Sequence, residues 1–473
     1  MKLSFIASPV WALALAQFAA ATQVKIDVDV AIFGGGSAGI HAAIQLRDAG
    51  ATVAVIEKKS QIGGHAETYT DPQGKSTNVG VVVFDNIEVA SNYFARLNVS
   101  IVRGSPLGTA GPTYTYDFTS GAQIPAVNTS AEAQQQLTAA LQSYSTNVLS
   151  KYPWIDEGFL VPDPVPEELT IPFGELAQKY NFTALMPTIA MYNYFTGDLS
   201  TIPSLYGIKG LGQGALKNLF GSFILPASGK TRDLYDAAAI ELGNSVLLNA
   251  DVVKVQRDVR INSTTTGVTV LIQQPGQPPK LIRARKLLVA APPTLENVGA
   301  FDLTAEERGL ISKFSSLGCW ASVANVPGLN VTLKNYGVHM PYNQPSIPGP
   351  YGFVAYGSPN NFLVTVGLPD AANTAAKGEA VVRQSLATLS AVGAVPADAL
   401  EKLTFPFSAV HSPYSLRVSA EEIKAGFYSK FLALEGARNT YWTGAVWAGH
   451  NSALIWNFNM GTVLPGLKKD LGL

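Results

Sequence analysis

The stretch of residues 27–57 constrains the fold of this chain more than any other part of the sequence. Residues 27–33 (DVDVAIF) alternate and then run apolar, which is typical of a buried parallel strand. The loop 34–39 (GGGSAG) follows directly and satisfies the pattern G-x-G-x-x-G. Residues 40–46 (IHAAIQL) then predict a helix, and residues 52–56 predict a second strand that ends at Glu57. This order predicts the βαβ unit of a Rossmann-like α/β domain that binds a dinucleotide.

The residues of the glycine loop each have a mechanical role in this prediction. Gly34 permits the tight turn after the strand, Gly36 lets the backbone approach a pyrophosphate, and Gly39 lets the helix pack closely on the strand. The pyrophosphate would then meet the free N–H groups at Ser37 and Ala38, at the positive end of the helix dipole. We therefore expect all five residues to bind the cofactor.

The residues after the second strand indicate which dinucleotide is bound. Glu57 can accept hydrogen bonds from the adenosine ribose, and its charge would repel the 2′-phosphate of NADP. Residues 62–68 (IGGHAET) resemble the second glycine motif of the flavin amine oxidase superfamily, in which G-G-(basic)-x-x-T follows the ribose acid. The adjacent Gly63 and Gly64 would let the chain run against the phosphates. His65 stands where the superfamily mostly has arginine, so the resemblance assigns it a phosphate-side position only. The implied cofactor is FAD.

A second resemblance to this superfamily lies in residues 439–458 (NTYWTGAVWAGHNSALIWNF). It implies a strand that ends at Gly444 and a helix, capped by Asn451 and Ser452, that points its N-terminus at the flavin ring. His450 falls where amine oxidases have a tyrosine that forms one wall of an aromatic cage. An ordinary histidine pKa would also suit it as a proton acceptor, although a purely structural role is the alternative. The acidic residue common in this motif is missing, so a simple amine is not the expected substrate.

The central part of the chain changes pattern twice. Residues 246–249, 252–257, 268–274 and 281–284 alternate as short strands, and residues 286–291 run apolar. In the superfamily a strand of this kind packs on the adenine side of FAD, which assigns an adenine contact to Val253. Other stretches lack the βαβ rhythm and include a helical pattern at 131–149 and alternating stretches after 300. We predict an FAD-binding domain built from 28–99, 229–299 and 431–473, and a discontinuous α+β substrate domain built from 100–228 and 300–430.

Flavin oxidation needs few side chains, because hydride moves from a substrate C–H to the ring itself. His411 and His339 are weaker candidates than His450 for accepting a proton. Monoamine oxidases carry a covalent flavin–cysteine link shortly before the C-terminal motif, whereas Cys319 lies far upstream. We expect Cys319 to be a small buried residue and FAD to be bound non-covalently. The sequence contains no Cys/His ligand cluster, so no metal is predicted.

Within the superfamily, the leader, the G-G-H variant and the acid-less C-terminal motif resemble fungal β-cyclopiazonate dehydrogenase-type proteins. That resemblance implies oxidation of a secondary metabolite by hydride removal from a C–H next to nitrogen or a conjugated system. O2 is a candidate electron acceptor. Two alternatives remain open, namely an FAD-dependent double-bond isomerase and a flavin-binding protein that has lost catalysis.

The N-terminus and the overall charge indicate the cellular compartment and the binding partners of the protein. Residues 1–21 place one lysine before an apolar stretch and end in three alanines, which predicts a secretory signal peptide. Sequons at Asn98, Asn128, Asn181, Asn262 and Asn330 agree with a secreted glycoprotein. The 33 basic and 34 acidic residues nearly cancel and form no block, so neither nucleic acid nor, after signal cleavage, a membrane is the expected partner. The expected partner is a small molecule.

Overall fold

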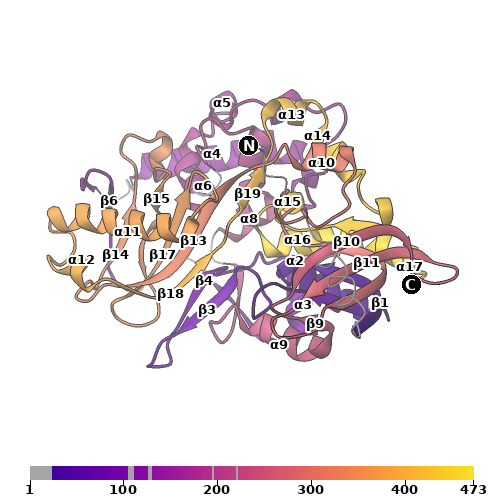
Figure 1. Cartoon of the computed structure of the whole chain (residues 1–473). Helices are drawn as coiled ribbons and strands as arrows, with labels where there is room; N and C mark the ends of the chain where they lie inside the picture. The colour runs from indigo at the N-terminus through magenta and orange to yellow at the C-terminus, as the bar shows by residue number, and fades with distance from the viewer. Residues whose placement is uncertain (1–23, 105–110, 126–129, 194–196, 220–221) are drawn as a thin grey trace, which may run out of the picture.

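The structure is a computed structural model that describes residues 24–104, 111–125, 130–193, 197–219 and 222–473. It contains two large sheets at opposite ends of the molecule, with helices α4, α5 and α6 along the top in Figure 1. The predicted signal peptide and the sequon at Asn128 lie outside the described residues. The α/β fold class is confirmed.

The first sheet is the dinucleotide-binding sheet, and its strands come from three separate parts of the chain. Its order is β10-β11-β12-β1-β2-β9, with β20 paired to β12. The pairs β1–β12, β1–β2, β2–β9 and β12–β20 are parallel, whereas β10 and β11 form an antiparallel extension. The strands are β1 (Val24–Phe33), β2 (Val53–Ile56), β9 (Val246–Leu247), β10 (Asp251–Arg260), β11 (Thr266–Gln273), β12 (Lys280–Val289) and β20 (Thr440–Trp442). The residue boundaries of the two domains stay a prediction.

Strand β12 is longer than the sequence pattern indicated. Two strands, 281–284 and 286–291, were expected there, but the structure has one, because the charged residues that interrupt the apolar pattern are paired. The Arg283 guanidinium contacts the Asp27 carboxylate at 2.6 Å, and Lys286 contacts Asp470 at 2.7 Å. The paired charges therefore do not end β12.

Helices cover the first sheet and carry the residues at its carboxyl edge. α2 follows β1 directly, and both α16 and α17 contact α2. The fully buried residues of β1, β2 and β12 form the centre of the larger hydrophobic core. The helices of this region are α2 (Ser37–Asp48), α3 (Glu88–Arg96), α9 (Asp233–Leu242), α15 (Ala445–Ala448), α16 (Ser452–Phe458) and α17 (Leu464–Leu471).

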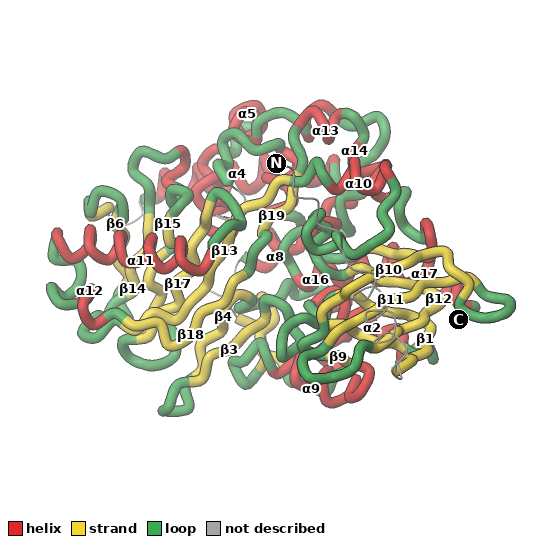
Figure 2. Tube along the Cα trace, in the orientation of Figure 1, coloured by secondary structure: helices red, strands yellow, loops and turns green. Residues whose placement is uncertain are grey.

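The second sheet has the order β18-β13-β17-β16-β14-β6-β7 and is mostly antiparallel, as expected for residues after 300. The pairing of β14 with β6 is parallel and joins two distant parts of the chain. Figure 2 shows this sheet beneath the long helix α11 (Thr374–Ala391), which packs on β13 and β17. The strands are β6 (Thr113–Tyr116), β7 (Gln123–Ile124), β13 (Ser315–Asn325), β14 (Thr332–Asn335), β15 (Gly349–Pro350), β16 (Gly352–Ala355), β17 (Asn361–Leu368), β18 (Thr404–Val410) and β19 (Tyr414–Arg417).

A helical layer and two small two-stranded sheets, β3-β4 and β5-β8, complete the fold. The predicted helix 131–149 is α-helical only to Ser143; a π-helical turn, Tyr144–Val148, follows. Tyr144 is buried there and its hydroxyl donates to the Leu211 carbonyl at 2.9 Å, so tertiary packing decides the change of helix type. The remaining elements are α4 (Ala131–Ser143), α5 (Phe173–Lys179), α6 (Met186–Asn193), α7 (Ser204–Gly210), α8 (Gln213–Asn218), α10 (Ala305–Ile311), α12 (Ala399–Lys402), α13 (Ala420–Lys424), α14 (Phe427–Leu432), β3 (Ala66–Thr70), β4 (Ser76–Gly80), β5 (Ile101–Gly104) and β8 (Phe223–Pro226).

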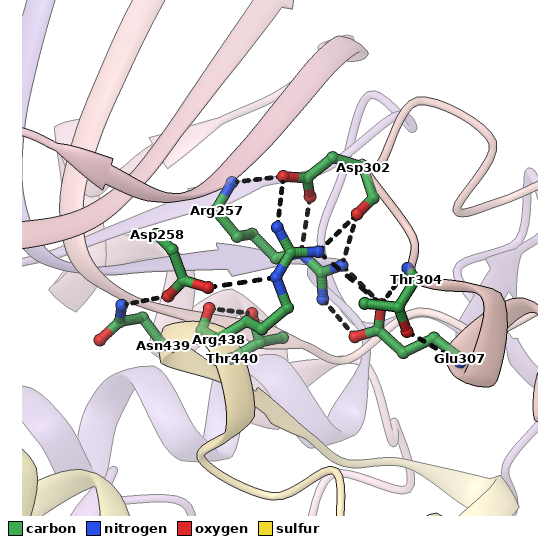
Figure 3. Close-up of polar contacts among 8 residues, drawn as sticks. All are labelled: Arg257, Asp258, Asp302, Thr304, Glu307, Arg438, Asn439 and Thr440. Carbon is green, nitrogen blue, oxygen red and sulfur yellow. Dashed lines mark hydrogen bonds and ion pairs between the residues drawn. The ribbon is translucent and has the colours of Figure 1, made fainter.

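A buried ionic network ties the C-terminal segment to the antiparallel extension (Figure 3). The fully buried Arg257 side chain donates to both carboxylate oxygens of Glu307, at 2.6 and 2.7 Å, and to Asp302 at 2.8 Å. Arg438 contacts the same Asp302 carboxylate at 2.8 Å from the other side. The network thus connects β10, the start of α10 and the turn before β20.

Candidate active site

The first glycine loop has the geometry that the sequence predicts. Gly34 has φ +109°, and a Cβ on it would lie 2.9 Å from the backbone nitrogen of Ala291. A Cβ on Gly39 would overlap the carbonyl oxygen of Gly34 and meet Ile32. The turn and the close packing of helix on strand therefore both require glycine at these positions.

The second glycine loop lies directly against the first. The Gly63 N–H donates to the Gly35 carbonyl at 2.8 Å, and a Cβ on Gly64 would lie 3.1 Å from the Cα of Gly36. Gly64 also has φ +61°. The backbones of the two glycine loops thus meet beside the start of α2. Because neither has side chains there, a cradle is left that fits a diphosphate and that side chains would fill.

Glu57 has a structural role in addition to the predicted one. Its carboxylate accepts from the Gly35 N–H at 2.7 Å and from the Lys59 N–H at 2.8 Å, and the residue is 7% exposed. These two bonds hold the glycine loop at the end of β2. Each carboxylate oxygen can accept a further hydrogen bond, so the predicted ribose contact remains chemically open to Glu57.

The adenine contact assigned to Val253 stays a prediction. The Val253 side chain is 53% exposed on β10, at the opposite edge of the sheet from β9. The residues beside Glu57 come just before it: the Glu57 N–H donates to the Leu247 carbonyl at 2.9 Å, and the Ala250 N–H donates to the Glu57 carbonyl at 3.0 Å. Residues 247–250 therefore lie beside Glu57, where the chain leaves β9 and crosses to β10.

Helix α16 and the residue that follows it, Asn459, are hydrogen-bonded to the glycine loop. The Trp456 indole N–H donates to the Ser37 hydroxyl at 3.0 Å, and the Asn459 amide donates to the Ala38 carbonyl at 3.0 Å. The predicted cap is confirmed, because the Asn451 side-chain oxygen accepts from the N–H of Ala453 at 3.0 Å and helix α16 begins at Ser452.

Gly444 follows β20 with φ +119°, as the predicted end of the strand requires. Gly444, Asn451 and Ser452 therefore lie on one connection between the sheet and α16, and Ser452 neighbours the Tyr235 hydroxyl together with Ser37. Their contact with a cofactor stays a prediction.

His450 has a different chemical character from the one expected. Its ring stacks on Tyr414 with centroids 3.7 Å apart, and its Nε2 accepts from the Ser415 N–H at 2.8 Å. The side chain is exposed in the structure, but the protein packed around the ring, with a smaller effect of His411, lowers its pKa to about 3. This pKa is lower than the ordinary value that was expected. A neutral ring whose Nε2 is already occupied is a poor proton acceptor.

Tyr414 is a site residue that sequence reasoning missed. The stacking distance leaves no room for a substrate group between Tyr414 and His450, so the pair forms one continuous wall rather than two sides of a cage. The only available signal was the aromatic residue directly after Pro413 in the stretch that contains His411.

Three of the five histidines of the chain meet at this place. His65 stacks on His411 at 4.3 Å and is parallel to His450 at 6.2 Å. Burial, with repulsion from its neighbours, holds the pKa of His65 well below its usual value, so it carries no charge toward the phosphates. His411 is 2% exposed with Nε2 3.9 Å from Glu67, whereas His339 is exposed on a turn after β14 and lies outside this group.

Cys319 has the buried position that the sequence predicts. Cys319 is 2% exposed on β13, and burial raises the pKa of its thiol to about 12, which makes it unreactive. Within the described residues, no group of three or more His, Cys, Asp or Glu side chains is arranged to hold a metal ion. None of the helices in the described part of the chain is long and apolar enough to cross a membrane.

Comparisons with known proteins agree with this geometry. The family described as "NAD(P)-binding Rossmann-like domain" matches residues 32–97. The FAD-dependent oxidoreductase oblC of Cochliobolus heterostrophus is 33% identical over 464 residues, covering 95% of this chain and 93% of the relative. The β-cyclopiazonate dehydrogenase of Aspergillus oryzae is 33% identical over 437 residues, covering 92% of this chain and 91% of the relative.

Solved structures show the same fold at low sequence identity. A CLA-producing fatty acid isomerase from P. acnes has a TM-score of 0.72 at 18% identity and covers 93% of this chain and 98% of its own. Cyclohexylamine oxidase from Brevibacterium oxydans has a TM-score of 0.60 at 14% identity and covers 94% of this chain and all of its own.

Proposed function

Because this chain belongs to the family of FAD-dependent oxidoreductases that includes β-cyclopiazonate dehydrogenase, we propose that it removes a hydride from a small organic substrate at a C–H next to nitrogen or a conjugated system. The protein is an oxidoreductase and its cofactor is FAD. The finer proposal concerns the substrate bond and the residues that surround it. Its support is the wall formed by His450 and Tyr414.

The residues that would hold the cofactor are assigned from the cradle between Gly36 and Gly64. Glu57 would hold the ribose, and the backbone at Ser37 and Ala38, with Gly63 and Gly64, would hold the diphosphate. FAD, when bound, supplies the hydride acceptor. No thiol in the described residues is exposed for a covalent link, which supports non-covalent binding.

The His450–Tyr414 wall suits a flat, conjugated substrate. The outer face of His450 is a neutral aromatic surface held in place by the Ser415 N–H and by the Tyr414 ring. A planar group can stack on such a surface, and stacking contributes about 0.5–1.5 kcal/mol beyond the burial of apolar area. In this proposal His450 orients the substrate and does not accept its proton.

A double-bond isomerase is the second candidate. The fatty acid isomerase from P. acnes shares the fold, and an isomerase returns the hydride to another carbon of the same substrate. The third alternative, a flavin-binding protein without catalysis, would retain the glycine cradle but lack turnover.

One experiment separates these functions. The purified yellow protein is mixed anaerobically with candidate amines and indole alkaloids while its visible spectrum is recorded, and O2 is then admitted. Bleaching followed by peroxide release supports an oxidase that uses O2. A rearranged product without net consumption of O2 supports the isomerase. A yellow protein that no candidate bleaches or rearranges supports the inactive alternative and counts against the proposal.

We further propose that the protein passes through the secretory pathway as a glycoprotein and acts on a secondary metabolite. All four sequon asparagines in the described residues, namely Asn98, Asn181, Asn262 and Asn330, are exposed, as glycan attachment requires. Mass spectrometry of protein recovered from culture medium, before and after glycosidase treatment, tests this proposal. A protein retained in the cell with its N-terminal residues intact would contradict it.

A further inference from the structure

A buried acid lies directly behind the His450–Asn451 connection. Asp85 follows β4 in the chain, is 2% exposed, and accepts a hydrogen bond from the Asn451 side-chain amide at 2.9 Å. The other end of the same Asn451 side chain caps α16. The C-terminal motif lacks its usual acid after Gly444, but a carboxyl group from a distant part of the chain contacts the motif at Asn451.

Two more charged groups surround Asp85. A Cβ on Gly214 would lie 3.6 Å from Asp85 Oδ2 and 3.4 Å from Asp156 Oδ2, so this glycine separates two carboxylates. Asp156 accepts from the Gly214 N–H at 2.7 Å, while its other carboxylate oxygen is buried without a hydrogen-bond partner in the described residues. Lys209 is 7% exposed, its Nζ donates to the Ile155 carbonyl, and its aliphatic chain lies against Gly449.

The mutual effects of these groups have opposite signs. Burial raises the pKa of Asp85 to about 6; the charge of Asp156 adds to this, whereas Asn451, Asn218 and Lys209 act against it. Burial lowers the pKa of Lys209 to about 8. Asp85 is therefore poised to change protonation near neutral pH, in a place where water does not screen a nearby charge.

The position of the cluster relative to the cofactor follows from the two glycine loops. Glu57 marks the adenosine end and the Gly36–Gly64 cradle marks the diphosphate. The flavin half must continue away from Glu57. His65, which follows the cradle, lies parallel to His450 at 6.2 Å, so that half is directed toward His450 and Asn451. Asp85 touches Asn451 from the protein side.

We propose that Asp85 takes up a proton from solvent when the bound flavin accepts electrons from the substrate. This inference rests on the placement of FAD in the proposed function. Two electrons arriving with one proton, as a hydride, leave negative charge on the flavin, and a neighbouring carboxylate opposes that charge. Protonation of Asp85 to the neutral acid forms one O–H bond, consumes one proton and transfers no electron, so the balance is complete. Because linkage is reciprocal, the protonation of Asp85 must in turn favour flavin reduction.

The test is the pH dependence of the reduction potential of the purified holoprotein, measured anaerobically with a reference dye between pH 5 and 9. The wild type should show a range of pH, called the segment below, in which reduction of the flavin is accompanied by the uptake of one more proton than at pH values outside this range. Asp85→Asn keeps an acceptor for Asn451 but cannot titrate. It should lose this segment and have a more positive potential above it.

Two further variants should move the segment in opposite directions. Lys209→Met removes a positive charge, raises the pKa of Asp85 and moves the segment to higher pH. Asp156→Asn removes a negative charge and moves it to lower pH. Asp398→Asn, at the residue before α12, is the matched control for the aspartate variants, because it changes the net charge by the same amount at a side chain that is 47% exposed and should leave the segment in place.

Each result decides the proposal. A segment that persists in Asp85→Asn, or that moves the same way in Lys209→Met and Asp156→Asn, overturns it. If Asp85→Asn fails to fold, the other two variants still give the opposed shifts or refute them. A wild-type protein without bound flavin would instead refute the proposed function, so the two failures are distinguishable.

Discussion

The Trp456 indole N–H donates to the Ser37 hydroxyl oxygen at 3.0 Å and to the Ser37 carbonyl at 3.3 Å, across 419 positions of sequence. Trp456 is itself fully buried between aromatic rings, with Tyr93 at 4.9 Å and Phe84 at 5.5 Å. Helix α16 thus holds Ser37, the first residue of α2, in place. The Ser37 hydroxyl oxygen accepts the indole bond, and the Ser37 O–H has the Tyr235 hydroxyl oxygen beside it as an acceptor.

Trp456→Phe should weaken FAD binding without unfolding the protein. The phenyl ring keeps most of the aromatic packing, but the hydrogen bond to Ser37 is lost. One hydrogen bond contributes about 1 kcal/mol, which corresponds to roughly a fivefold higher Kd for FAD. This Kd is measured by the quenching of flavin fluorescence when FAD is titrated with apoprotein. Trp154→Phe, on a 3-10 turn away from the cradle, is the control and should bind FAD as the wild type does.

Gly36→Val should abolish FAD binding. A Cβ on Gly36 already comes within 3.8 Å of the Gly64 Cα, so the two methyl groups of valine would occupy the cradle itself. The purified variant should be colourless and should retain a cooperative unfolding transition. Gly309→Ala, where a Cβ meets nothing within 4 Å, should remain yellow. A fully loaded Gly36→Val protein would contradict the position assigned to the diphosphate.

His450→Phe should lower turnover while leaving the acid limb of the pH–rate profile between pH 5 and 8 unchanged. His450, with a pKa of about 3, is neutral throughout that range, so its removal takes away no titration. Phenylalanine preserves the stack on Tyr414 but leaves the Ser415 N–H without its acceptor. The measurement is kcat/KM against pH. Loss of a break near pH 6.5 in the variant would show that His450 does accept a proton.

His41 should make the protein less stable in acid. It is buried on α2, and burial lowers its pKa to about 3, below the unfolded value of 6.5. The unfolded state therefore binds more protons between these values, so stability is complete above pH 6.5 and falls as the pH decreases toward 3. Between pH 7.5 and 4.5 this site should cost about 2–3 kcal/mol. His41→Gln should reduce that difference in urea unfolding; equal pH slopes would refute the assignment.

Arg257→Met should destabilise the protein by about 3–5 kcal/mol, because the buried Glu307 loses its two-pronged partner and keeps only a longer ion pair, with Arg438 at 4.0 Å. The expected change is a lower urea midpoint with an unchanged m-value. Lys377→Met breaks a pair with Asp370 that is exposed on both sides, and should cost less than about 1 kcal/mol. Similar losses in the two variants would show that the network in Figure 3 contributes no more than a surface pair.

Much of the fold could be predicted because the decisive patterns are local. The positive φ of Gly34, the overlap of a Gly39 Cβ with the Gly34 carbonyl and the cap at Asn451 each depend on residues within one strand, turn and helix, and each has the expected geometry. Predictions that relied on a single interrupted or unbroken pattern were less accurate. The charges in β12 turned out to be paired, and a helix changed type where Tyr144 is buried.

The chemistry of the site was harder to predict because it depends on enclosure and on partners far away in the chain. His450 was identified by its motif, yet its lowered pKa and occupied Nε2 come from the surrounding protein and from Ser415. Residues 247–250 lie beside Glu57 through backbone hydrogen bonds that join distant parts of the chain, whereas the adenine contact assigned to Val253 by resemblance stays a prediction.

By itself, the sequence determined that this chain builds a dinucleotide-binding βαβ unit and carries FAD, because a turn, a helix dipole and a ribose acid are encoded within a short continuous segment. Only the tertiary structure decided which side chains can hold a proton. Asp85 and Asn451 are 366 positions apart, and the burial that raises the pKa of Asp85 exists only after three distant segments have packed together. Desolvation is a property of the folded interior, so no local pattern encodes it.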